Sequence, residues 1–172
     1  MPRILVSPLS AIEDAIQRHR PSHMVTLLSP EHMIQTPIGF DVARHLKLGV
    51  NDIVDIGQGT APPDKVHIEQ LIEFSRDWKA EAPFLIHCWA GVSRSMAGAY
   101  TILCDRLGPG SEQRIAHSLR KRAPYALPNT LMVRLADEAL GRDGRMIEAV
   151  RELGAGVMVE QGVCTEFPLA NL

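Results

Sequence analysis

The sequence predicts an α/β domain with a central, mainly parallel sheet of about four or five strands flanked by helices. Two observations support this fold class. Short apolar runs alternate with segments of helical pattern as far as Leu107, and such alternation is typical of strand–helix–strand units. Beyond Leu107 nearly every segment has a helical pattern, so we expect the C-terminal half of the domain to be helical.

Four short segments have the composition of strands. Residues 84–86 are wholly apolar, as expected of a central strand that is buried on both faces. In residues 45–50, leucine and valine alternate with glycine or more polar residues. The expected strands are residues 3–6, 24–28, 45–50 and 84–86, with one further candidate at residues 157–160.

Helical segments fill most of the remaining chain. One begins at Asp64, a residue type that commonly caps helices, and ends before Pro83. Residues 51–63 contain two glycines and two prolines and are expected to form a loop. The whole chain, residues 1–172, is expected to be one domain with a tail of unclear structure at residues 155–172. The other expected helices are residues 9–20, 95–107, 111–122, 129–140 and 143–153.

The bulk composition excludes several classes of protein. The 172 residues are 45% hydrophobic and 22% charged, with a formal net charge of −2. This charge gives no reason to expect nucleic acid as a partner, and no apolar run approaches the ~20 residues of a membrane span. The three cysteines lack the spacing of a disulfide framework, so we expect a reducing compartment, with the cytoplasm as the default location. The sequence makes no prediction about oligomeric state.

The most informative segment directly follows the expected strand at residues 84–86. Cys88 and Arg94 are separated by five residues, and neither of the other two cysteines has an arginine at that distance. His87 precedes the cysteine, Gly91 lies three residues after it, and Ser95 follows the arginine. A strand therefore enters this segment and a helix leaves it, which is the local context of an anion-binding loop.

The residues of this loop have the chemistry of a phosphate-binding site with a nucleophile. A tight turn into a helix N-terminus directs several backbone N–H groups at a tetrahedral anion, and Gly91 relieves crowding where the backbone turns. Arg94 offers a planar fork for two phosphate oxygens, and the same positive surroundings favour the thiolate of Cys88. The expected phosphate-binding residues are Cys88, Trp89, Ala90, Gly91, Val92, Ser93 and Arg94.

Two neighbours of the loop each have a catalytic and a structural interpretation. Ser95 can donate a hydrogen bond to the Cys88 sulfur and ease its departure from a phosphorylated intermediate, and it can also cap the helix that follows. His87 can orient the loop through hydrogen bonds, or it can be a core histidine whose hydrogen bonds are satisfied. Both interpretations stay open for both residues.

The pattern His87-Cys88-x-x-Gly91-x-x-Arg94-Ser95 resembles the signature of the protein tyrosine phosphatase superfamily, close to its dual-specificity and small bacterial branches. The resemblance covers residues 46–107 and implies an α/β fold with no metal and no cofactor. It also implies a two-step reaction through a cysteinyl-phosphate. In such a reaction an aspartate on a mobile loop protonates the leaving oxygen and then activates water.

Three aspartates precede the cysteine as candidates for this general acid, and none lies in a Trp-Pro-Asp triplet. We favour Asp52, which follows directly on the expected strand at residues 45–50. Asp55, deeper in the loop, is the alternative general acid, and Asp64 is better explained as the helix cap. No pair of histidines or cysteines has the spacing of a zinc site, so we expect no metal.

The composition of the loop also bears on the substrate. Trp89, Ala90, Val92 and Ser93 include no lysine or arginine, whereas several phosphates on one ring require several positive charges. We therefore expect a phosphorylated protein or a small phosphate monoester as the partner, with phosphotyrosine first. The alternatives are an arsenate-reductase-like or sulfurtransferase-like enzyme and a catalytically silent module that binds phosphoproteins.

Overall fold

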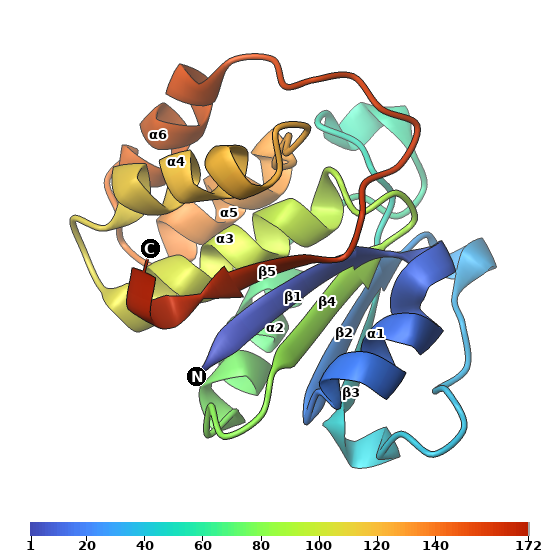
Figure 1. Cartoon of the computed structure of the whole chain (residues 1–172). Helices are drawn as coiled ribbons and strands as arrows, with labels where there is room; N and C mark the ends of the chain where they lie inside the picture. Colours follow the sequence, from blue (N-terminus) through green and yellow to red (C-terminus); the bar gives the residue numbers. More distant parts are fainter. Residues whose placement is uncertain (172) are drawn as a thin grey trace.

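The computed structural model describes residues 1–171. Its strands are β1 (Arg3–Pro8), β2 (His23–Leu28), β3 (His45–Gly49), β4 (Phe84–Cys88) and β5 (Thr165–Pro168). They form one sheet in the order β3-β2-β4-β1-β5, in which the first four strands are parallel and β5 is antiparallel to β1 (Figure 1). The expected fold class, a mainly parallel sheet of about four or five strands, is confirmed.

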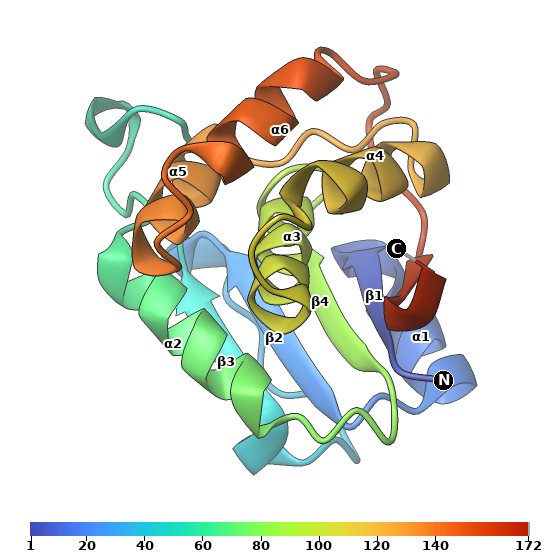
Figure 2. The same ribbon diagram turned by 90° about the vertical axis from the view of Figure 1, so that its left-hand side faces the viewer.

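Helices cover both faces of the sheet (Figure 2). Those of the described residues are α1 (Ile12–His19), α2 (Lys65–Asp77), α3 (Arg94–Leu107), α4 (Glu112–Arg122), α5 (Thr130–Ala139) and α6 (Arg145–Leu153). α1 covers one face, and α2 and α3 pack on the other, with α4, α5 and α6 outside them. No helix in the described part of the chain is both long enough and apolar enough to cross a membrane.

β4 lies at the centre of the sheet and is buried on both faces. Phe84 and Ile86 belong to the large core under α2 and α3, whereas Leu85 belongs to a smaller cluster under α1. No residue of the strand is more than 1% exposed. This confirms the interpretation of the wholly apolar run as a central strand.

The expected strand at residues 157–160 is wrong. This segment has no regular structure, and Val157 donates its N–H to the carbonyl of Pro124 (3.0 Å), in the loop after α4. The side chain of Met158 is 97% exposed. The last strand forms instead at β5, where Phe167 is fully buried in the main core. Burial of this aromatic ring favours pairing with β1 at this position, whereas the apolar residues at 157–159 stay exposed.

Two helices can be compared with the starts that the sequence predicts for them. The first expected helix begins as a 3₁₀ turn over Leu9–Ala11, so α1 starts only at Ile12. The expected cap at Asp64 is confirmed, because its carboxylate accepts a hydrogen bond from the N–H of His67 (3.1 Å) at the start of α2.

Candidate active site

The loop between β4 and α3 forms the base of the candidate site. Cys88 is the last residue of β4, and Arg94 is the first residue of α3. The loop therefore lies at the carboxyl edge of the parallel strands, where ligands bind in open α/β sheets. It also opens into the N-terminus of a 14-residue helix, whose first N–H groups have no partners within the helix.

Gly91 allows the loop to turn tightly against the end of β1. Its φ of 72° lies in the left-handed region, which favours glycine. A Cβ atom at this position would lie 2.7 Å from the nitrogen of Pro8 and 2.9 Å from the carbonyl carbon of Ser7. Both the backbone conformation and the close approach therefore require glycine here.

The carbonyl groups of the loop bind backbone N–H groups from three other parts of the chain. The four bonds run from Leu9 to Trp89 (3.1 Å), from Gly162 to Ala90 (2.8 Å), from Leu127 to Val92 (3.0 Å) and from Asn129 to Ser93 (3.3 Å). The C=O and the N–H of a trans peptide point in opposite directions. The N–H groups that follow these carbonyls therefore turn toward the inside of the loop.

These inward N–H groups form a nest for an anion. The N–H of Gly91 binds the Cys88 sulfur (3.2 Å). Within residues 1–171, the N–H groups of Ala90 and Ser93 have no hydrogen-bond partner. A tetrahedral oxyanion in the loop would satisfy such donors.

The sulfur of Cys88 lies within hydrogen-bond distance of two donors. Besides the N–H of Gly91, the hydroxyl of Ser95 lies 3.1 Å from Sγ. A thiolate has no proton to give, so Ser95 donates when the sulfur is ionised. The N-cap of α3 is Ser93, and the interpretation of Ser95 as the helix cap is therefore wrong. Cys88 is only 1% exposed, which places the sulfur beneath the surface of the site.

The guanidinium of Arg94 is held in place by the backbone of the neighbouring loop. Nη1 donates to the carbonyl of Val50 (2.9 Å), and the residue is only 6% exposed. Nε is buried without a hydrogen-bond partner among the described residues, 3.9 Å from a carboxylate oxygen of Asp52. The fork is thus fixed while donors stay free for an oxyanion.

Asp52 lies beside the loop between β4 and α3. Its Oδ1 accepts hydrogen bonds from Oγ of Ser93 (2.7 Å) and from Nδ2 of Asn129 (3.0 Å). The side chain is 40% exposed, so the carboxylate also reaches solvent. A group that gives a proton to a substrate and later takes one from water must reach both.

The other two aspartates act as helix caps. Asp55 accepts a hydrogen bond from the N–H of Gly57 (3.0 Å) at the start of the 3₁₀ turn Ile56–Gln58. Asp64 caps α2. In the described part of the chain, neither carboxylate has a hydrogen bond to the loop between β4 and α3. The structure brings only Asp52 of the three candidates together with that loop.

Asn129 is a residue of the site that the sequence patterns do not reveal. Its Nδ2 binds both Asp52 and the carbonyl of Ile53 (3.0 Å), and its Oδ1 accepts the N–H of Met132 as the cap of α5. Its own N–H binds the carbonyl of Ser93. An asparagine before a helical segment predicts the cap alone, because the other contacts join segments far apart in the sequence.

His87 is fully buried and directly precedes Cys88 in the chain. Its Nδ1 lies 3.4 Å from the carbonyl oxygen of Cys88, and its Nε2 lies 2.7 Å from Oγ1 of Thr26. Burial lowers the pKa of His87 to about 4, so the ring is neutral near neutral pH. The ring is thus a core histidine whose two nitrogens both have hydrogen-bond partners, one of them in the backbone of Cys88.

A cavity of about 210 Å³ opens over the loop and is lined by Leu28, Ser29, His32, Trp89 and Arg94. The Trp89 side chain is 56% exposed. The ring of His32 meets it at a steep angle, with ring centroids 5.4 Å apart. The entrance to the site is thus aromatic on one side and carries the charge of Arg94 on the other.

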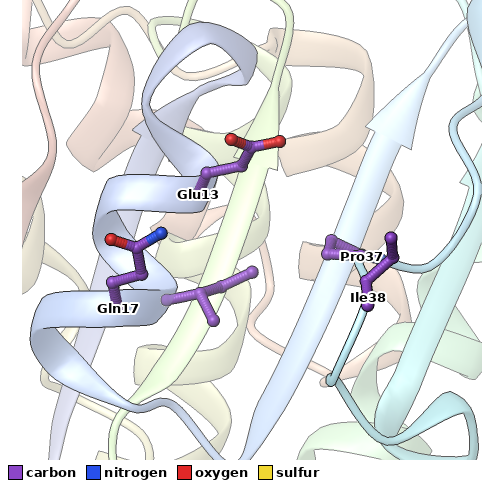
Figure 3. Close-up of a pocket in the computed structure, with 5 residues that line it drawn as sticks. Glu13, Gln17, Pro37 and Ile38 are labelled. Atoms are coloured by element: carbon purple, nitrogen blue, oxygen red, sulfur yellow. The ribbon is translucent and has the colours of Figure 1, made fainter.

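A second cavity, of about 240 Å³, lies between α1 and the segment before β3 (Figure 3). Glu13 and Gln17 line it from α1, and Pro37 and Ile38 line it from the segment. Its lining includes one carboxylate and one amide but no residue of the phosphate-binding loop. This cavity therefore contains no thiol and no arginine.

The remaining cysteines lie outside the site. Cys104 is fully buried in α3, and burial raises its pKa to about 12. Burial also raises the pKa of Cys164, which is half-buried just before β5. Among residues 1–171, no three His, Cys, Asp or Glu side chains gather as a metal-binding group.

Comparison with solved structures shows that the described residues have the fold of dual-specificity and protein tyrosine phosphatases. DUSP15 superposes with a TM-score of 0.64 and 20% identity over 89% of this chain and 91% of the other. The human tyrosine phosphatase-like serine/threonine/tyrosine-interacting protein superposes with a TM-score of 0.64 and 18% identity, over 81% of this chain and 91% of the other. PTPMT1 in complex with PI(5)P superposes with a TM-score of 0.56 and 14% identity, over 87% of this chain and 93% of the other. No protein-family model and no curated protein matches the sequence.

At these identities the similarity concerns the fold, and the same fold supports different functions. The activity must therefore be inferred from the site. At the loop between β4 and α3, Cys88 contacts Ser95, and Arg94 lies next to Asp52. These are the residues that the sequence pattern singled out as catalytic candidates.

Proposed function

We propose that the chain is a cysteine-dependent phosphatase that hydrolyses phosphate monoesters through a cysteinyl-phosphate. The observation that carries this proposal is the content of one loop and its neighbour. A cysteine sulfur, an arginine fork and inward N–H groups belong to the loop, and the carboxylate of Asp52 lies beside it. The proposed nucleophile, anion-binding groups and proton donor thus all belong to this loop or lie against it.

In the first step, the thiolate of Cys88 attacks phosphorus, and the bond between phosphorus and the leaving oxygen breaks. Arg94 and the inward N–H groups bind the other phosphoryl oxygens, which carry the negative charge. Asp52 gives its proton to the leaving oxygen, so the alcohol or phenol departs neutral.

In the second step, water attacks the phosphorus of the cysteinyl-phosphate while the carboxylate of Asp52 takes its proton. The S–P bond breaks, and its electron pair returns to the sulfur of Cys88. The Ser95 hydroxyl, 3.1 Å away, donates to the departing thiolate. Inorganic phosphate is released and Asp52 is protonated again, so the cycle closes without a cofactor.

We propose aryl phosphates as the substrate class, with phosphotyrosine in a protein first. Trp89 and His32 form an aromatic wall next to the loop, which suits a flat phenyl ring. The variable loop positions carry no lysine or arginine, so Arg94 is the one positively charged side chain of the loop. The neighbour PTPMT1 was solved with PI(5)P, and phosphoinositides are therefore the substrates to test against phosphotyrosine.

Two rival functions use the same fold or a similar loop. The human neighbour is named phosphatase-like and interacting, so the fold alone does not imply turnover. A silent binding module needs no general acid, whereas here Asp52 is held beside the loop by Ser93 and Asn129. An arsenate-reductase-like or sulfurtransferase-like enzyme would also leave this carboxylate without a role.

We also propose that residues 1–172 are one phosphatase domain that works in the cytoplasm. The N–H of Gly162, in the tail after α6, binds the loop carbonyl of Ala90, which supports a tail that belongs to the domain. The three cysteines are free, as in proteins of reducing compartments.

Release of phosphate from phenyl phosphate tests the proposed activity. We expect turnover in the presence of a chelator and inhibition by vanadate. Cys88→Ser should abolish turnover yet still bind inorganic phosphate, and Arg94→Lys should lose most activity because the planar fork is lost. Survival of most activity in Cys88→Ser would refute the proposal. Binding without any turnover by the unaltered protein would favour the silent module.

A further inference from the structure

A chain of hydrogen bonds leads from the segment before β3 to the backbone of the nucleophile. Oγ1 of Thr26 lies 2.7 Å from Nε2 of His87 and 2.7 Å from Nε2 of His45. Nδ1 of His45 lies 2.9 Å from Oγ1 of Thr36. At the other end, Nδ1 of His87 lies 3.4 Å from the carbonyl oxygen of Cys88. We name these four side chains the Thr–His relay.

The register of the strands explains why these side chains meet. Thr26 on β2 is paired with His87 on β4, and His45 on β3 is paired with Met24, two residues before Thr26. Because side chains alternate along a strand, the three polar groups lie on one face of the sheet. Met24 belongs to the small cluster with Ala15 of α1, so this is the face that α1 covers.

The partners determine the direction of every bond in the relay. A carbonyl oxygen can only accept, so Nδ1 of His87 carries a proton and its Nε2 does not. Thr26 must then donate its hydroxyl proton to His87, and its oxygen accepts from Nε2–H of His45. This leaves Nδ1 of His45 as an acceptor, and Thr36 donates to it. The four bonds thus run in one direction, from Thr36 to Cys88.

Burial keeps this arrangement in place. Burial lowers the pKa of both His45 and His87 to about 4, and the charges of Lys47 and Arg94 act on them in the same direction. Thr26 and His87 are fully buried, so water cannot replace a lost partner. Because the two neutral rings are joined through the Thr26 hydroxyl, the tautomer of one fixes the tautomer of the other.

We propose that Thr26, His45 and Thr36 are positioning residues for Cys88, because they hold the His87 ring in the orientation in which its Nδ1–H donates to the Cys88 carbonyl. This inference rests on the proposed role of Cys88 as the nucleophile. The carbonyl oxygen is the negative end of a dipole in the residue that carries the sulfur. An N–H directed at it offsets that negative potential and favours the thiolate.

Loss of the Thr26 hydroxyl would reverse this effect. Nε2 of His87 and the N–H of His45 would both be buried without their hydroxyl partner. The His87 ring is then no longer held from the Nε2 side, and the bond from its Nδ1–H to the Cys88 carbonyl, 3.4 Å in the structure, weakens. The carbonyl then loses its donor, and the thiolate becomes less favourable.

The test measures alkylation of Cys88 by iodoacetamide as a function of pH, followed on the Cys88 peptide by mass spectrometry. Thr26→Val keeps the shape of threonine and removes the hydroxyl. We expect it to slow alkylation about threefold to tenfold on the acid side of the curve and to shift the curve to higher pH. Thr26→Ser restores the hydroxyl and should restore the curve.

Thr101→Val is the matched control. Thr101 is also fully buried, and its hydroxyl binds the carbonyl of Ala97 within α3, away from the relay. This variant should leave the alkylation curve unchanged. Thr36→Val removes the hydroxyl at the far end without touching the core, so it tests the relay even if Thr26→Val does not fold. Its effect should have the same sign, with recovery in Thr36→Ser.

Two outcomes would overturn the inference. One is an unchanged alkylation curve in folded Thr26→Val and in Thr36→Val. The other is an equal shift in the valine and serine variants, which would mean that packing alone is responsible. Alkylation needs no phosphate ester, so the result is independent of turnover. If the relay variants shift the curve but the unaltered protein hydrolyses no aryl phosphate, the proposed function fails and the relay stands.

Discussion

Oγ of Ser93 donates a 2.7 Å hydrogen bond to Oδ1 of Asp52, and this bond joins the phosphate-binding loop to the loop that follows β3. The N–H of the same serine faces the inside of the nest, where it has no partner among the described residues. One residue thus offers its backbone N–H to the proposed anion site and its side chain to the proposed acid. The loop proposed to bind phosphate thereby also positions Asp52.

The first prediction concerns this acid. The phenol of tyrosine has a pKa of about 10, so its anion is a poor leaving group. Asp52→Ala should therefore lower kcat for phenyl phosphate by about 10² to 10⁴. The loss should be much smaller for a nitrophenyl phosphate, whose leaving group needs less help. The measurement is kcat against leaving-group acidity for a series of aryl phosphates.

Asp55→Ala and Asp64→Ala are the comparisons for this test. Asp64→Ala removes a helix cap and should cost about 0.5–2 kcal/mol in the free energy of unfolding, with no dependence on the leaving group. If only Asp55→Ala gives a leaving-group dependence, Asp52 is not the acid although the mechanism stands. If neither Asp52→Ala nor Asp55→Ala gives one, the proposed acid step is wrong.

The sequence predicts the parts of this protein that depend on local patterns. The apolar run of β4, the cap at Asp64 and the spacing of Cys88 and Arg94 are local, and the structure has the strand, the cap and the loop where they were expected. The contacts of Asn129 and the Thr–His relay join strands and loops far apart in the sequence. They depend on strand order and register, which no local pattern encodes.

Trp89 provides a prediction about the substrate. Removing the ring in Trp89→Ala should lower kcat/KM for a phosphotyrosine peptide about threefold to tenfold, because an aromatic pair contributes about 0.5–1.5 kcal/mol. Inhibition by inorganic phosphate should not change, since phosphate has no ring. Trp89→Phe should recover most of the loss. An equal loss of affinity for inorganic phosphate would mean that the loop is distorted and that the aromatic wall has no selective role.

Gly162 provides a prediction about the tail. A Cβ there would lie 2.4 Å from the ring of Tyr125, whose hydroxyl is held by the N–H of Val163 (2.9 Å). Gly162→Ala should therefore cost about 1–3 kcal/mol in the free energy of unfolding. It should also weaken phosphate binding, because the N–H of Gly162 supports the carbonyl of Ala90. Urea unfolding and inhibition by phosphate measure the two effects.

A double variant separates the clash from other causes. In a Tyr125→Ala background the ring is absent, so Gly162→Ala should have little further effect on either measurement. An undiminished effect in that background would contradict the steric explanation.

The cysteines provide a prediction about oxidation. Cys88 and Cys104 are 1% and 0% exposed, so exposure does not distinguish them. Burial raises the pKa of Cys104 to about 12, which leaves it a thiol near neutral pH. The proposed thiolate of Cys88 is the more oxidisable species. Mild peroxide treatment followed by mass spectrometry should therefore modify Cys88 first, and preferential modification of Cys104 would contradict the proposed site.

The buried histidines predict how stability depends on pH. Burial lowers the pKa of His45 and His87 from 6.5 to about 4 in the folded protein. Between these values the unfolded chain binds two protons that the folded chain does not bind, so stability rises with pH. Their stabilising contribution is complete above pH 6.5 and is lost as the pH falls toward 4. Each proton contributes a slope of about 1.4 kcal/mol per pH unit in this window.

Urea unfolding across this window measures the slope, and His45→Gln isolates one of the two rings. Glutamine does not titrate, so the slope of stability against pH in this variant should be lower by the contribution of one proton, about 1.4 kcal/mol per pH unit. The comparison uses slopes, so it holds even if the substitution lowers stability at every pH. A slope in His45→Gln equal to that of the unaltered protein would show that His45 already binds its proton in the folded state. The tautomers assigned to the Thr–His relay would then be wrong, because a protonated His45 has no acceptor nitrogen for Thr36.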